Sequence, residues 1–304
     1  MTDGEAYKRA GTLLVLLFLT FAVWWPEFFK VSDGSWLGAS ISEFLGEGSC
    51  PKGLLCVVFL DVGQGDSIFI QSPSGTQMLV DGGRDSSVLR ELGTVMGFWD
   101  REIDYVLATH PDADHIGGLS DVMERYEVSN VIRTENESKT PDWQAFESGV
   151  KEEGAKVFYA RRGQVFDLGF GTTLEILFPD IDASELESNT ASIVARLIYG
   201  ETSFMLTGDS PKAIEEYLVL VEGENLDSDV LKVGHHGSRT STSELFLDEV
   251  EPRFAVISAG KDNSYGHPHV EVTDMLFNKR IEIHSTAEEG RITFVSNGNK
   301  PSLK

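Results

Sequence analysis

One short loop, residues 109–118, constrains this chain more than any other segment. The apolar run at 105–108 precedes it and predicts a buried strand, so the loop leaves a strand end, where rigid scaffolds commonly hold catalytic residues. Imidazole and carboxylate ligands together suit a divalent metal ion. We therefore expect a metal site here, and not a polar turn whose histidines face water. Its candidate ligands, all within six residues, are His110, Asp112, Asp114 and His115.

The first thirty residues predict a membrane anchor. Between Ala10 and Phe29 the only ionisable residue is Glu27, and twenty helical residues span about 30 Å, enough for a bilayer core. Lys8 and Arg9 precede this run and two tryptophans end it, which places residues 1–9 in the cytoplasm and the body outside. A cleaved signal peptide is the alternative, and in both cases the body leaves the cytoplasm. We expect a single-pass protein of the cell membrane with an extracytoplasmic catalytic domain.

The two cysteines, Cys50 and Cys56, leave their pairing open. Outside the cytoplasm a disulfide between them is permitted. Cys56 also fits as a buried core residue of the predicted strand at 54–60, and free cysteines are commonly buried. Two cysteines are too few for a zinc knuckle.

The sequence predicts a main domain at 54–297, after a linker at 30–53 and before a tail at 298–304. Strands and helices alternate along this domain. Apolar and β-branched runs predict strands at 54–60, 67–71, 77–80, 105–108, 128–133, 156–159, 172–178, 192–199, 203–206, 230–233, 254–258 and 291–296. Helices are predicted at 41–45, 87–92, 118–126, 142–152 and 211–220. This order predicts an α/β protein in which two sheets pack together under outer helices.

Further polar residues follow other predicted strands. They are Asp209, the pair His235 and His236, and His267. Six of the seven histidines fall in three such loops, a clustering that indicates function, and we expect these loops to meet at one edge of the sandwich. His284 is the exception, and we expect it to be an ordinary strand residue.

These segments resemble the metallo-β-lactamase superfamily, whose metal signature is His-x-His-x-Asp-His, and in particular the β-lactamase-like domain of ComEC-type competence proteins, which serve DNA uptake. Besides the loop from His110, the matching pieces are Phe-Leu-Asp-Val-Gly-Gln-Gly-Asp-Ser at 59–67, Leu-Val-Asp-Gly-Gly at 79–83, Leu-Thr-Gly-Asp at 206–209 and Leu-Lys-Val-Gly-His-His-Gly-Ser at 231–238. The resemblance covers 54–297 and implies an αββα sandwich. The multi-helix channel of ComEC would then be a separate partner protein.

The resemblance also implies a binuclear metal centre. Asp114 and His115 would hold one metal ion, and Asp114 would also act in catalysis. His110 and Asp112 would belong to the other ion, and Asp209 would bridge the two.

Other residues would support this centre. Either His235 or His236 completes the first site, with His235 preferred. His267 would contact phosphate or protonate the leaving group, the alternative being a turn residue before Pro268. The residues expected to orient the ligands by hydrogen bonds are Asp81, Asp61, Asp66 and Asn189, and those expected to bind substrate are Lys232 and Ser238.

Two departures from the superfamily pattern bear on the metal. Asp112 replaces the second histidine of the signature, and no histidine lies between His115 and His235, so Asn189 or Ser192 would occupy the place of the usual ligand before the bridging aspartate. Oxygen-rich sites suit manganese or magnesium better than zinc. We expect two divalent ions, Mn²⁺ or Zn²⁺, with Mg²⁺ as a further candidate.

A metal pair activates water and clamps both oxygens of an in-line displacement, which fits a phosphodiester. The expected function is therefore that of a membrane-anchored phosphodiesterase or nuclease acting on DNA. A net charge of −24 favours the alternative, hydrolysis of a small ester, lactam or phosphodiester, because a nuclease normally presents a basic track. A third interpretation is a non-catalytic DNA-binding or assembly partner, against which the intact ligand set argues.

Overall fold

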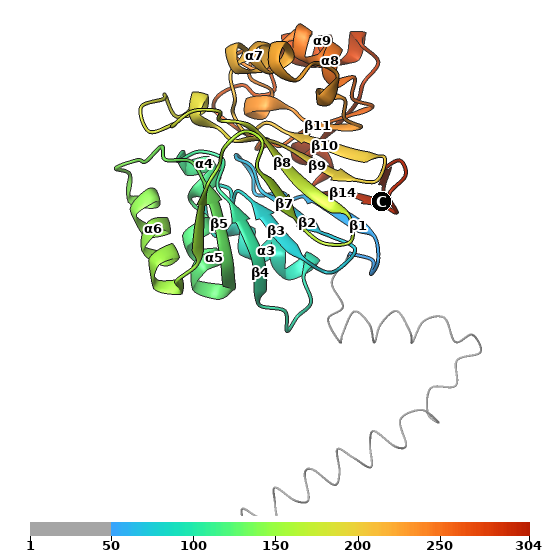
Figure 1. Cartoon of the computed structure of the whole chain (residues 1–304). Helices are drawn as coiled ribbons and strands as arrows, with labels where there is room; N and C mark the ends of the chain where they lie inside the picture. The colour runs from blue at the N-terminus through green and yellow to red at the C-terminus, as the bar shows by residue number, and fades with distance from the viewer. Residues whose placement is uncertain (1–49) are drawn as a thin grey trace, which may run out of the picture. The chain divides into compact units, whose positions relative to one another are not determined.

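Two β-sheets lie face to face between two layers of helices in the computed structural model, which describes residues 50–304 (Figure 1). The first sheet has the strand order β15-β14-β1-β2-β3-β4-β5-β6. Its strands are β1 (Leu55–Phe59), β2 (Ile68–Gln71), β3 (Gln77–Val80), β4 (Glu102–Leu107), β5 (Glu127–Arg133), β6 (Lys156–Tyr159), β14 (Ile292–Ser296) and β15 (Ser302–Leu303).

The second sheet has the order β13-β12-β11-β10-β9-β8-β7. Its strands are β7 (Val165–Asp167), β8 (Thr172–Phe178), β9 (Val194–Tyr199), β10 (Thr202–Leu206), β11 (Val230–Lys232), β12 (Phe254–Ile257) and β13 (Glu282–Ser285). Strands β10 to β13 run parallel, so their carboxyl ends meet at one edge of this sheet.

Helices cover the outer face of each sheet (Figure 1). One layer holds α3 (Ser87–Val95), α5 (Leu119–Arg125) and α6 (Pro141–Glu153); the other holds α7 (Lys212–Glu222), α8 (Glu244–Val250) and α9 (Val270–Asn278). Two short helices, α4 (Ala113–Ile116) and α10 (Thr286–Glu289), and 3-10 turns at Asn189–Ala191, Gly223–Leu226 and Gly234–Gly237 complete the elements.

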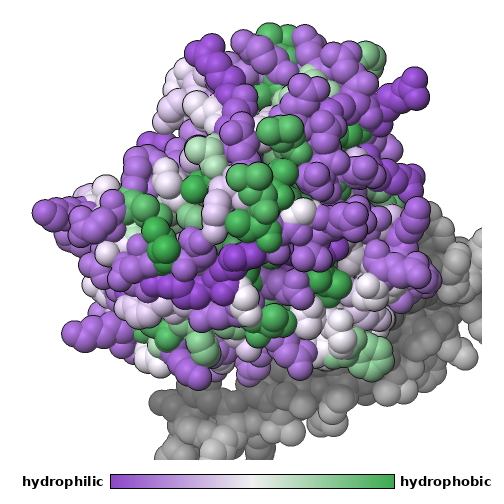
Figure 2. Space-filling model, turned by 45° about the horizontal axis from the view of Figure 1, so that its top comes forward, coloured by the Kyte–Doolittle hydropathy of each residue, from purple (hydrophilic) through white to green (hydrophobic). Residues whose placement is uncertain are grey.

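Three apolar layers hold the sandwich together, and β1 shows how the sequence builds them. Leu55, Val57 and Phe59 point into the layer between the sheets, whereas Cys56 and Val58 pack under the helices of the first sheet. Because side chains alternate along a strand and both faces are buried, the strand is apolar throughout. A third layer lies between the second sheet and α7, α8 and α9. The face drawn in Figure 2 is mainly hydrophilic, with hydrophobic residues in a few groups.

The expected α/β sandwich of two sheets is confirmed, with differences in detail. The structure adds β7, α8 and α9, which the sequence patterns did not predict, and residues 302 and 303, expected in a tail, pair with β14 as β15. Cys50 and Cys56 form a disulfide, with their Cα atoms 5.7 Å apart. Within residues 50–304, no helix is both long and apolar enough to cross a membrane. The expected span at 10–29 and the short helix at 41–45 lie outside the described residues.

Strand direction fixes where the loops go. β1 and β3 are each antiparallel to β2, and β4 is parallel to β3, so β1, β3 and β4 all end at the same edge of the first sheet. Asp61, Asp81 and His110 follow these three ends. Strand direction alone therefore places the loops that follow β1, β3 and β4 next to one another.

Candidate metal centre

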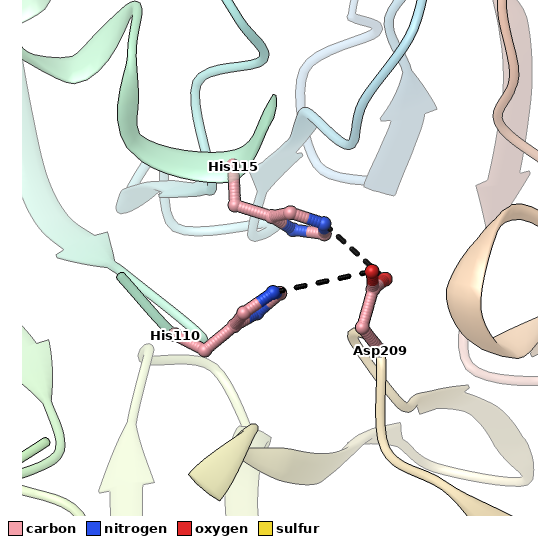
Figure 3. A group of neighbouring side chains, drawn as sticks. All are labelled: His110, His115 and Asp209. Carbon is pink, nitrogen blue, oxygen red and sulfur yellow. Dashed lines mark ion pairs between the residues drawn. The ribbon is translucent and has the colours of Figure 1, made fainter. Parts of the chain in front are cut away.

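The loop after β4 presents two histidines to one point. His110 leaves the strand end directly, and His115 lies on α4, for which Asp112 is the N-cap residue. Both side chains are fully buried, and their rings lie 4.1 Å apart. Figure 3 shows both imidazoles pointing toward Asp209, which follows β10 of the other sheet.

Asp209 is the residue around which the cluster gathers. Its Oδ1 lies 3.2 Å from Nε2 of His115, and its Oδ2 lies 3.9 Å from Nε2 of His110 and 3.6 Å from Nε2 of His236. Asp114 joins from α4, with its Oδ2 3.4 Å from Nε2 of His236. The structure thus brings together five residues from three loops on two sheets.

The adjacent histidines after β11 differ in their surroundings. Both adopt left-handed backbone conformations, with φ of 49° for His235 and 55° for His236, which are uncommon for non-glycine residues and occur often at functional sites. His236 is buried and takes part in groups of ligand atoms that lie within 4.8 Å of one another. His235 has a 25% exposed side chain and lies 3.5 Å from Asp209. The geometry therefore favours His236 as the ligand, where the sequence favoured His235.

Asp81 orients the first-sheet histidines. Its Oδ2 lies 2.8 Å from Nδ1 of His115, and its two oxygens accept hydrogen bonds from the backbone N–H and the hydroxyl of Thr109. The same hydroxyl lies 3.0 Å from Nδ1 of His110. Because a carboxylate holds a proton on Nδ1 of His115, Nε2 is the nitrogen that would coordinate a metal ion.

Asp66 plays the matching part for His236. Its Oδ1 lies 3.2 Å from Nδ1 of His236, which also faces the carbonyl oxygen of Ser258 at 2.9 Å. Its Oδ2 lies 2.8 Å from Nζ of Lys232, and both side chains of this pair are buried. Lys232 was expected to bind substrate; with its ammonium group inside the fold, bonded to Asp66 and to the carbonyl oxygen of Val233, it supports His236 instead.

The glycine-rich turn at 61–66 lets the two halves of the cluster approach. Gly65 has a φ of 129°, and a Cβ atom there would come within 2.1 Å of the carbonyl oxygen of Asp114. The next residue, Asp66, donates its backbone N–H to that oxygen. Only glycine fits this approach, so the turn and α4 are locked together.

Charge pairing dominates protonation in the cluster. Burial alone would lower the pKa of His115, but the carboxylates of Asp209 and Asp81 raise it well above its usual value. Burial also opposes ionisation of Asp209, yet His115 and His236 hold its pKa well below the usual range. The pKa of His236 is raised to about 9, because Asp209 and Asp66 outweigh burial. Ionised carboxylates thus face imidazolium groups, an arrangement in which a divalent cation can take the place of protons.

Four remaining candidate site residues lie at the margin of the cluster around Asp209 or outside it. Asp112 has a 45% exposed side chain, lies 3.8 Å from Nε2 of His110 and accepts a hydrogen bond from Ser188 at 2.6 Å. The Asp61 carboxylate accepts the N–H of Gly63 and so shapes its own turn. Among the residues that the structure describes, the Asn189 side chain contacts no member of the cluster. Ser192, in contrast, accepts a hydrogen bond from the backbone N–H of Asp209.

His267 stands at the outer side of the cluster. Its ring lies 5.5 Å from that of His235 and stacks on exposed Tyr265 at 5.7 Å. Partial burial and the charges of His235, His236 and His269 lower the pKa of His267 to about 4. Its ring is therefore neutral near pH 7, which does not suit the expected role as proton donor. Ser238, expected to bind substrate, is buried and faces Thr240 at 2.9 Å.

Three contributing residues escaped the sequence analysis. Thr109 bridges Asp81 and His110, and its position directly before the first histidine was the available signal. Ser188 meets Asp112 from 76 positions away, and no sequence pattern marks it. Glu215, buried on α7, accepts the backbone N–H groups of Thr242 and Ser243 and so braces the loop that carries His236.

The cluster fits a metal ion on its own geometry. Buried polar atoms normally have hydrogen-bond partners, yet four atoms that converge here have none in the described structure: Nε2 of His110, His115 and His236, and Oδ1 of Asp209. Imidazole nitrogens backed by carboxylates, together with free carboxylate oxygens, form the donor set that divalent transition metals prefer.

Comparison with known proteins places the chain in a family. The model of the metallo-beta-lactamase superfamily matches residues 60–261. The chain belongs to this superfamily. Among solved structures, CmlA, a diiron beta-hydroxylase from Streptomyces venezuelae, has a TM-score of 0.52 at 16% identity over 86% of this chain and 60% of that one. Zn(2+)-bound PqqB from Methylobacterium extorquens has a TM-score of 0.50 at 13% identity over 76% of this chain and 87% of that one. These two likenesses show the fold alone.

Curated relatives include a protein named for competence. ComE operon protein 3 of Bacillus subtilis is 32% identical over 260 residues, covering 78% of this chain and 32% of that protein. Competence protein ComA of Neisseria gonorrhoeae is 31% identical over 249 residues, covering 80% of this chain and 33% of that protein. The resemblance to ComEC-type proteins is thereby confirmed. This chain spans about a third of the length of the curated relatives it matches.

Proposed function

We propose that this protein is a membrane-anchored, metal-dependent phosphodiesterase that hydrolyses DNA outside the cytoplasm. The observation that carries the proposal is the convergence of four unpartnered, buried ligand atoms around Asp209. The likeness to a protein named for competence supports DNA as the substrate.

The chain's own residues divide the work. His115, His236 and Asp114 would hold one ion and His110 with Asp112 the other, with Asp209 between them. Divalent ions held there would polarise the phosphoryl oxygens and make water a better nucleophile. Asp81 and Asp66 keep the imidazoles turned so that their Nε2 atoms face the centre.

The exposed side of the centre belongs to His235 and His267. His235 has a 25% exposed side chain and lies 3.5 Å from Asp209, so it is placed to meet substrate as it approaches Asp209. His267 is neutral at pH 7, so it would donate its single N–H to a phosphate oxygen and would not add a positive charge.

A small phosphodiester is the second candidate, favoured by the charge of −24. The exposed cationic side chains close in sequence to the cluster are Arg84, Arg239 and Lys261, while Lys232 is buried in its pair with Asp66. Three scattered cations make a weak track for a DNA backbone, whose affinity grows with each neutralised phosphate.

Digestion by the full chain in detergent tests the proposal. Labelled single- and double-stranded DNA, and bis-p-nitrophenyl phosphate beside them, would be incubated with Mn²⁺ or with a chelator. We expect Mn²⁺-dependent cleavage of DNA that His115→Asn abolishes. His284→Asn is the matched control, because His284 is equally a buried histidine but lies on β13, bonded to Glu289. Cleavage of the small ester alone would favour the second candidate, and cleavage of neither would overturn both.

A further inference from the structure

The edge of the first sheet opposite the metal centre carries exposed aromatic side chains. Strands β1, β3 and β4 all begin at this edge, because they run in the same direction and end at the metal centre. The segment between α3 and β4 lies here and contains Phe98, 62% exposed, and Trp99, 82% exposed. Their rings meet edge to face at 4.8 Å.

A third aromatic residue joins them from the second sheet. Phe170, 75% exposed, is in the turn between β7 and β8. That turn is tied to the first sheet by the hydroxyl of Ser74, which donates to the carbonyl oxygen of Leu168. Gln77, at the start of β3, in turn donates to the carboxylate of Asp100, the residue after Trp99. We call the side chains of Phe98, Trp99 and Phe170 the aromatic edge.

We propose that the aromatic edge rests in the headgroup region of a phospholipid bilayer. Trp and Phe combine large apolar area with a preference for this interface. Exposing three aromatic rings on turns of one edge is costly unless something covers them. Isolated exposed residues elsewhere, such as Phe277 on α9, need no such explanation.

The route of the chain supports lipid as the partner. The described body begins at Cys50, which the disulfide to Cys56 fixes beside the start of β1, at this same edge. The proposal rests on the membrane attachment in the proposed function: the apolar run at 10–29 is separated from Cys50 by the twenty residues 30–49. A chain of that length keeps the body within roughly 70 Å of the bilayer. Such tethering raises the effective concentration, so that a weak affinity for the interface suffices.

Aromatic insertion, and not charge, would make the contact. The chain is strongly acidic, so anionic lipid would repel it. The charged groups next to Trp99 are engaged within the protein: Asp100 accepts from Gln77, and Arg101 lies over the ring of Tyr126. With the aromatic edge in the bilayer, the metal centre at the opposite edge faces away from the membrane.

The test is the depth of Trp99 in phosphatidylcholine vesicles that contain the full chain. The other four tryptophans are replaced by Trp24→Phe, Trp25→Phe, Trp36→Phe and Trp143→Phe. The matched control adds Trp99→Phe and Phe277→Trp, which moves the single tryptophan to a 76% exposed position on α9. We expect brominated lipid to quench Trp99 at least about two-fold more than the control, and acrylamide in the water to quench it correspondingly less.

Three results would overturn the proposal. One is equal quenching of Trp99 and the control tryptophan by acrylamide. Another is shielding of Trp99 from both quenchers that depends on the protein-to-lipid ratio, which would indicate a second copy of the chain as the partner. The last is failure of the full chain to float with vesicles. A triple variant, Phe98→Ser, Trp99→Ser and Phe170→Ser, should still hydrolyse DNA in detergent. Failure of the proposed activity can therefore be distinguished from failure of the proposed lipid contact.

Discussion

The two halves of the metal centre are built from the same residue types but supported differently. In one half, His115 and His236 are buried and each has its Nδ1 beside a buried carboxylate, Asp81 or Asp66. In the other half, Nδ1 of His110 meets only the hydroxyl of Thr109, and Asp112 is 45% exposed. Hydrogen bonds to charged partners are roughly twice as strong as neutral ones, and they make an imidazole a better ligand. The carboxylate-backed half should therefore bind its ion more tightly than the hydroxyl-backed half.

Asp209 belongs to both halves, so its loss should have the largest effect. Asp209→Asn removes the charge that faces four histidines while hardly changing the side-chain volume. We expect hydrolysis of phosphodiesters to fall at least about 10³-fold, because bound metal supplies several kcal/mol of transition-state stabilisation. Steady-state kinetics at saturating Mn²⁺ measure the loss, and a circular-dichroism spectrum checks the fold. Full activity in a folded variant would remove Asp209 from the centre.

Lys232 should matter to stability far more than a surface lysine. Lys232→Met removes the buried cation bonded to Oδ2 of Asp66 and leaves His236 as the charged partner of that carboxylate; breaking a buried pair in this way costs roughly 3–5 kcal/mol. The matched control is Lys279→Met, which breaks a more exposed ion pair with Asp248 and should cost less than about 1 kcal/mol. Urea unfolding of both variants measures the difference. Equal costs would mean that the Asp66–Lys232 pair does not support the carboxylate-backed half.

Glu215, which braces the loop of the carboxylate-backed half, should make the free energy of unfolding depend on pH. Burial raises the pKa of Glu215 to about 7, against the hydrogen bonds from Ser243 and Thr242. The folded state then binds the proton more tightly than the unfolded chain, so the free energy of unfolding should fall as pH rises from about 4.5 to about 7, by roughly 3 kcal/mol in all.

Comparing wild type with Glu215→Gln isolates this contribution, since other groups titrate equally in both. Urea unfolding at pH 5 and pH 8 should show a smaller decrease for the variant. An identical pH dependence in the two proteins would show that Glu215 is ionised in the folded state at both values.

Single substitutions in the two halves should separate their metal affinities. Asp81→Asn removes the carboxylate behind His115 and should weaken the tighter ion about 10- to 100-fold. Asp112→Asn should weaken only the other ion, and by less, because that carboxylate is exposed and already bonded to Ser188. Competition with a chelating dye measures both affinities. A larger effect of Asp112→Asn on the tighter ion would reverse the comparison.

The sequence predicted the site residues that a local pattern marks and missed those that depend on contacts between distant segments. The ligands of the loop at 109–118 are close together in the chain and follow a clear strand, so local pattern was enough to propose them. Thr109, Ser188 and the pairing of Asp66 with Lys232 depend on contacts between distant segments, and a buried lysine before a histidine pair looks like a substrate contact until its burial is known. The choice between His235 and His236 depends on two left-handed residues that no composition rule specifies.

Secondary structure shows a similar limit. β1 is apolar throughout and was predicted to within one residue at each end, whereas β4 begins three residues before its predicted start, because Glu102 and Asp104 interrupt its apolar run. α9 (Val270–Asn278) was not predicted, because its β-branched valines and threonine have low helix propensity and packing against β13 stabilises it instead. α8 offered a signal in Ser243, whose hydroxyl caps its first turn, but the helix has only seven residues.

The central claim is that the two halves of the metal centre bind their ions with unequal affinity. Titration of metal-free protein with Mn²⁺, monitored by isothermal titration calorimetry, tests it most directly. Two unequal halves predict two binding steps whose dissociation constants differ by about tenfold or more. Asp112→Asn should weaken only the second step, and Asp81→Asn should weaken the first by a larger factor. A single step, or two equal steps that respond alike to both substitutions, would contradict the account.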